Sequence, residues 1–92
     1  MLEYFKKKYV TMEYNDPNVI SFWIAKFRIQ LEFNKRWYDE EWRNTCLLTV
    51  TKLTDDVHRD YEQITTLILD PTTDLIELYI NLLKEKINVK SN

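Results

Sequence analysis

The absence of glycine is the strongest constraint on this chain of 92 residues. Glycine supplies the left-handed backbone conformations of tight β-hairpins, and glycine-rich loops cradle phosphates in common nucleotide-binding motifs. Helices joined by short loops tolerate its absence best. The 45% hydrophobic and 30% charged residues are typical of a folded, soluble protein. The composition therefore predicts one all-α domain.

The stretch from Asp16 to Phe33 predicts the first helix, because Asp-Pro is a favourable helix start. At about 100° per residue, one apolar stripe has the spacing of a core-facing side. It contains Ile20, Trp23, Ile24, Phe27 and Leu31. A second stripe, on the opposite side, contains Phe22, Ile29 and Phe33. The second stripe must be covered either by another molecule or by the N-terminal residues Leu2, Tyr4 and Phe5.

Three further helices complete the predicted bundle. They run from Asp39 to about Leu53, from Thr54 to Asp70, and from Asp74 to about Asn88, and Asp74 with Glu77 resembles a capping box. We therefore expect a compact bundle of four main helices over residues 16–88. Residues 1–15 are expected to form an extended or short-strand lead-in, and residues 89–92 a tail.

Few residues suggest catalysis or metal binding. Asp55, His58 and Glu62 share one side of the third predicted helix, but a solvated helix face explains them better, because metal sites need three or four convergent ligands. Cys46 and His58 are the one possible catalytic thiol pair. Cys46 is expected to point into the core, where a thiol behaves as a small hydrophobe. We therefore expect no catalytic residue, no metal and no cofactor, and predict that the protein is not an enzyme.

Basic and aromatic residues alternate at three places, a pattern that some nucleic-acid-binding proteins use. The basic residues concerned are Lys6, Lys7, Lys8, Lys35, Arg36, Lys84, Lys86 and Lys90. The net charge of −2 opposes this function, and Asp55 and Asp56 would repel phosphate in a helix-turn-helix arrangement. Specific nucleic-acid binding is therefore not expected. The N-terminus lacks a signal-peptide pattern, and no apolar run is long enough for a membrane span, so we expect an intracellular, cytoplasmic protein.

The order of these features, from about Val10 to Ile87, resembles the N-terminal capsid lobe of Gag polyproteins from LTR retrotransposons. The matching parts are Asp16-Pro17 followed by Trp23 and Ile24, then WYDEEW, Leu53, VHRDYEQI, LILDP and LIELYINLLKEKI. The resemblance implies an all-α fold and a non-enzymatic structural role. It also implies association of the protein with itself or with a related Gag protein.

In such capsid lattices the early helices commonly carry the contacts, so the resemblance places a self-association surface on the second stripe and its neighbours. The residues proposed for it are Phe22, Lys26, Ile29, Phe33 and Trp37. Trp37 belongs to an aromatic group with Tyr38 and Trp42 and would mark a binding surface if it faces solvent. The alternative function is that of a small viral or mobile-element accessory protein that binds and inhibits another protein.

Overall fold

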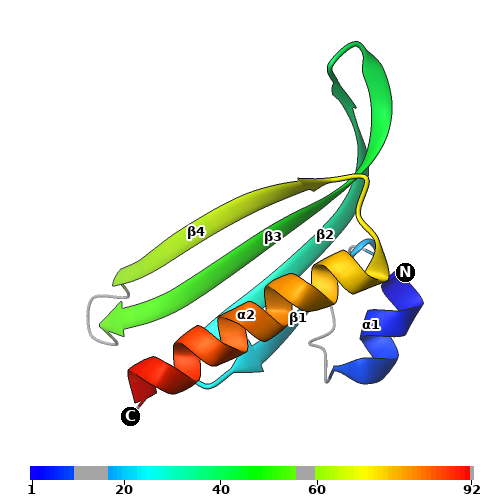
Figure 1. The fold of residues 1–92 in the computed structure, drawn as a ribbon. Helices are drawn as coiled ribbons and strands as arrows, with labels where there is room; N and C mark the ends of the chain where they lie inside the picture. Colours follow the sequence, from blue (N-terminus) through cyan, green and yellow to red (C-terminus); the bar gives the residue numbers. More distant parts are fainter. Residues whose placement is uncertain (10–16, 56–59, 92) are drawn as a thin grey trace.

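The chain forms an antiparallel β-sheet with helices packed against one of its faces (Figure 1). This computed structural model describes residues 1–9, 17–55 and 60–91, and within them there are four strands and two helices. The elements in chain order are α1 (Leu2–Lys8), β1 (Val19–Ile24), β2 (Phe27–Tyr38), β3 (Glu41–Asp55), β4 (Asp60–Leu69) and α2 (Thr73–Ser91).

The strands are arranged as a meander in the order β1-β2-β3-β4. β1 pairs with β2 from Val19 opposite Glu32 to Ile24 opposite Phe27. β2 and β3 pair along the whole of β2, and β3 pairs with β4 with a register shift between Leu53 and Asp55. Among the described strands, β1 and β4 each have one partner, so they are the two edges of the sheet.

The prediction of an all-α bundle of four main helices is therefore wrong, and the reason lies in the period of the apolar residues. Phe27, Ile29, Leu31 and Phe33 alternate with polar residues, and paired positions on neighbouring strands share a face. Apart from Trp23, which lies on the other face of β1, the two opposite stripes of the predicted helix are thus a single face of β1 and β2. Period 2 places both sets of side chains on the covered face, whereas period 3.6 left one set uncovered.

Tight turns form here without glycine. Ala25, Asp39, Glu40 and Asp70 have positive φ angles of 52°, 55°, 64° and 48°. Asp39 and Glu40 are the two loop residues between β2 and β3, and left-handed φ at both is typical of a type I′ turn. The inference that a glycine-free chain lacks tight hairpins was therefore wrong. A non-glycine residue in this region costs about 1–2 kcal/mol, which the paired strands must offset.

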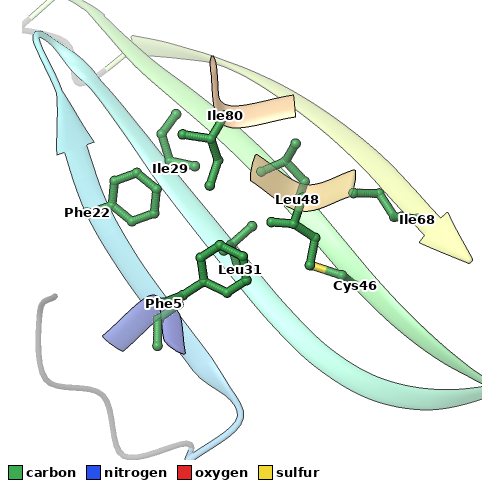
Figure 2. Packing of buried hydrophobic residues seen from close by; sticks show 10 residues of the cluster. Phe5, Phe22, Ile29, Leu31, Cys46, Leu48, Ile68 and Ile80 are labelled. Atoms are coloured by element: carbon green, nitrogen blue, oxygen red, sulfur yellow. The ribbon is translucent and has the colours of Figure 1, made fainter. Parts of the chain in front are cut away.

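The core lies between the sheet and the helices (Figure 2). Each of β1, β2, β3 and β4 contributes buried side chains to it, and both helices cover them. The buried cluster contains Phe5, Ile20, Phe22, Ile29, Leu31, Cys46, Leu48, Ile68, Ile76 and Ile80. The opposite face of the sheet carries mainly polar side chains, such as Gln30, Thr49 and Thr65, as expected for an antiparallel sheet with one covered face.

The predicted C-terminal helix is confirmed, although it begins earlier and continues further than expected. The backbone N–H of Leu75 donates to Thr72 Oγ1 at 3.1 Å, so Thr72 caps α2 in place of Asp74. Glu77 does not close a capping box and accepts hydrogen bonds from Lys8 and Tyr4 of α1. The bond from Lys8, followed by the bond from Tyr4, lowers the pKa of Glu77. This contact joins the two helices.

The N-terminal residues do not form an extended lead-in, because residues 2–8 are helical. Phe5 stacks on Phe33 with ring centroids 6.3 Å apart, and Tyr9 stacks on Phe22 at 4.3 Å. The N-terminus thus folds back over the second stripe, which was the intramolecular alternative. Residues 10–15 of the predicted lead-in lie outside the described residues. The predicted tail is part of α2 as far as Ser91.

Ile29 provides a test of this packing, because its side chain is fully buried in the core. We expect Ile29→Ala to lower the free energy of unfolding by about 3 kcal/mol, measured by urea denaturation followed by circular dichroism. Trp23→Ala is the matched control: Trp23 is exposed on the neighbouring strand, and we expect a loss of about 0.5 kcal/mol. Equal effects of the two substitutions would contradict this core.

Candidate interaction surfaces

The five residues predicted to form a self-association surface do not lie together. Phe22 and Ile29 are buried in the core, and Phe33 packs against Phe5. Lys26 is exposed in the turn between β1 and β2, whereas Trp37 is exposed at the far end of β2. Of the five, the structure leaves Lys26 and Trp37 accessible to a partner, at opposite ends of one strand.

Trp37 lies on a hairpin that projects beyond the rest of the sheet (Figure 1). The pairing of β1 with β2 ends at Glu32, and the pairing of β4 with β3 ends at Thr45. Residues 35–43 therefore form a two-stranded ribbon without a flanking strand among the described residues. The segment from Trp37 to Trp42, which we call the hairpin tip, has the sequence WYDEEW.

The hairpin tip is both aromatic and acidic. Trp37 and Trp42 face each other across the strands, with ring centroids 5.6 Å apart and an interplanar angle of 73°. Such an edge-to-face pair stabilises a ribbon by about 0.5–1.5 kcal/mol. Even so, 61% of the surface of Trp37 and 67% of that of Trp42 remain exposed. Their neighbours in the turn are Asp39, Glu40 and Glu41.

Ionic and hydrogen bonds hold the base of the ribbon. Arg43 contacts Glu41 at 3.0 Å and Asp70 at 3.2 Å, and so links the ribbon to the corner between β4 and α2. The backbone N–H of Asp70 donates to the carbonyl of Asn44 at 2.9 Å. The Thr45 hydroxyl donates to the carbonyl of Asn34 at 2.8 Å. The ribbon is therefore anchored in a defined direction relative to the sheet.

A second surface is an apolar groove between α2 and the strands β2, β3 and β4. Its volume is about 430 Å³. Its lining residues are Phe27, Leu48, Val50, Ile64, Thr66, Tyr79, Leu82, Leu83, Lys86 and Ile87. Lys86 is the one charged side chain among them. Ile64 remains 69% exposed and Leu82 47% exposed. The residues that the structure describes therefore leave this apolar groove open.

The strand that forms one wall of the groove is also an edge of the sheet, and its charged residues, Asp60 and Glu62, are confined to its first part. β4 is the last strand of the sheet, and its residues 63–69 read QITTLIL, without a charge or a proline. Edge strands normally carry charges or prolines that prevent pairing with other chains. The sequence did not predict this surface, because Ile64 and Ile68 also fit the spacing of the third predicted helix. The uncharged run rich in β-branched residues was the signal that could have indicated it.

Of the residues considered for catalysis or metal binding, the structure describes only the side chain of Cys46. Cys46 is buried, as predicted, and its burial raises the pKa of the thiol to about 12. His58 lies outside the described residues, as do the side chains of Asp55 and Glu62. Among the residues that are described, no group of three or more His, Cys, Asp and Glu side chains could hold a metal ion.

Comparison with models of known protein families, with curated proteins and with solved structures finds no match for this chain. The assignment to a Gag capsid lobe therefore has no support, and the helices on which the resemblance depended are strands over much of residues 19–69. In the part of the chain that the structure describes, neither helix is long and apolar enough to cross a membrane.

The burial of Cys46 makes a prediction about its reactivity. At pH 8 we expect the native protein to react with a disulfide reagent such as DTNB far more slowly than the urea-unfolded chain, because the folded thiol is buried and protonated. The folded pKa lies above the ordinary value near 9. The contribution of the thiol to stability is therefore present below about pH 9 and is lost as the pH rises toward 12. Rapid labelling of the native protein would contradict this assignment.

Proposed function

We propose that this protein is a non-enzymatic interaction module that associates with further copies of itself. The observation that supports this function best is the apolar groove beside β4, where Ile64 and Leu82 stay exposed although ten other described side chains form a buried core. Contiguous exposed apolar surface is typical of interaction sites. Burying these side chains in an interface favours association, because it removes apolar surface from water.

A second copy is a suitable partner because the groove ends at a free sheet edge. The backbone groups on the outer side of β4 can hydrogen-bond a further strand, and residues 63–69 contain no charge that would repel an identical strand. No bound cofactor or catalytic group is needed for this role.

Binding of an unrelated protein is the second candidate function, and the hairpin tip favours it. Tryptophan residues are enriched among the side chains that dominate binding energy, and Trp37 and Trp42 are exposed on a ribbon that extends away from the sheet. This candidate predicts that purified protein alone stays monomeric at every concentration.

The role of the groove in self-association can be tested with Ile64→Lys. We expect the wild-type protein to increase in average mass with concentration, measured by light scattering after size exclusion, and the variant to keep the mass of one chain. A lysine at this position places a charge in the apolar surface and beside the free edge. Trp23→Lys, at a similarly exposed position on the opposite edge strand, should associate like the wild type. A strictly monomeric wild type would refute self-association.

A further inference from the structure

The hairpin tip and the groove are complementary in chemistry. The tip presents two exposed indole rings and the carboxylates of Asp39, Glu40 and Glu41, with no basic residue between Trp37 and Trp42. The groove presents an apolar floor, and its one charged lining residue is the cation Lys86. Lys52 lies at the same end, with Nζ 5.8 Å from the ring centroid of Phe27. An aromatic and acidic segment therefore matches an apolar groove whose one charged lining residue is a cation.

One chain cannot bring its own tip to its own groove. Phe27, which lines the groove, and Trp37 lie ten residues apart on the continuous strand β2, about 33 Å at the usual rise of a strand. Figure 1 shows the ribbon projecting past the N-terminal end of α2, while the groove residues Leu82, Leu83 and Lys86 belong to the C-terminal half of that helix. A tip that enters the groove must come from a second molecule.

We infer that the groove receives the hairpin tip of another copy of this chain, an interface that rests on the proposed self-association. The groove volume of about 430 Å³ lies within the usual range of ligand pockets, about 300–1,000 Å³. It can hold an aromatic side chain, while Lys86 meets the carboxylates of the turn. Because donor and acceptor surfaces differ, the contact is heterologous. Successive copies then join head to tail, in an open chain or a ring.

The anchoring of the ribbon supports this assignment. Arg43 joins Glu41 and Asp70, and Trp37 packs edge-to-face on Trp42, so the tip is ordered before it meets a partner. Binding of a preorganised segment avoids part of the entropy loss that a flexible loop would incur. Asp39 and Glu40 lie at the outermost position of the ribbon, so Lys86 at the rim of the groove of a second copy can reach their carboxylates.

Mixing two variants tests the heterologous contact. The tip variant is Trp37→Ser with Trp42→Ser, and the groove variant is Leu82→Asp. We expect each variant alone to remain monomeric at concentrations where the wild type forms a series of oligomers. A mixture of the two should give a dimer with one chain of each kind, because the intact tip of the groove variant still fits the intact groove of the tip variant. Analytical ultracentrifugation measures all four samples.

Controls separate loss of binding from loss of folding. Trp23→Ser removes an exposed tryptophan outside the tip and should leave association unchanged. Lys86→Glu reverses the charge at the rim of the groove, and we expect association to become about tenfold weaker at low salt. Adding Glu40→Lys to the same chain should restore much of the lost affinity. Each variant should keep the circular dichroism spectrum of the wild type.

The outcomes distinguish this interface from the proposed function itself. A wild type that stays monomeric would refute self-association and the hairpin contact together. A tip variant that associates as strongly as the wild type would overturn the hairpin contact alone, and it would leave pairing of β4 edges as the mode of self-association. Failure of the mixed variants to form a dimer, with both folded and the wild type associating, would also overturn it.

Discussion

The packing of α2 across one face of the sheet is the interaction on which the remaining structure depends. Ile80 of this helix lies beside Ile29 and Leu48, which are buried side chains of β2 and β3 (Figure 2), and Ile76 belongs to the same buried cluster. A single helix is narrower than a four-stranded sheet, so it cannot cover the whole face. α1 covers the side of β1 and β2, where Phe5 and Tyr9 stack on Phe33 and Phe22.

The same geometry explains why the other side stays open. Tyr4 and Lys8 bind Glu77 and so attach α1 beside the N-terminal half of α2. No described element takes the corresponding position over β4. Ile64 and Leu82 are therefore left at the surface as a consequence of how the helices divide the sheet between them. The groove is a property of the whole fold and could not be found by inspecting one segment.

The sequence allowed the C-terminal helix and the burial of Cys46 to be predicted, but not the sheet. Apolar residues in α2 follow a helical period, with Ile76, Ile80, Leu83 and Ile87 on one side of the helix. In β1 and β2, Ile20, Phe22, Ile29 and Leu31 satisfy a strand period, yet each can also be placed on a helical wheel. Hairpin turns normally reveal such strands through glycine or Asn-Gly. Here Ala25, Asp39 and Glu40 occupy the left-handed positions, so that signal was absent.

The projecting ribbon combines an unfavourable turn with a favourable aromatic pair. Left-handed φ at Asp39 and Glu40 costs about 1–2 kcal/mol per residue, and the edge-to-face contact of Trp37 and Trp42 returns about 0.5–1.5 kcal/mol. Stabilisation of the ribbon thus accounts for the contact between the two indoles. More than half of each indole nevertheless stays in water. A two-stranded ribbon with no flanking strand among the described residues has no further layer to bury the outward faces of the rings, so the pair that closes the ribbon also forms an exposed aromatic surface.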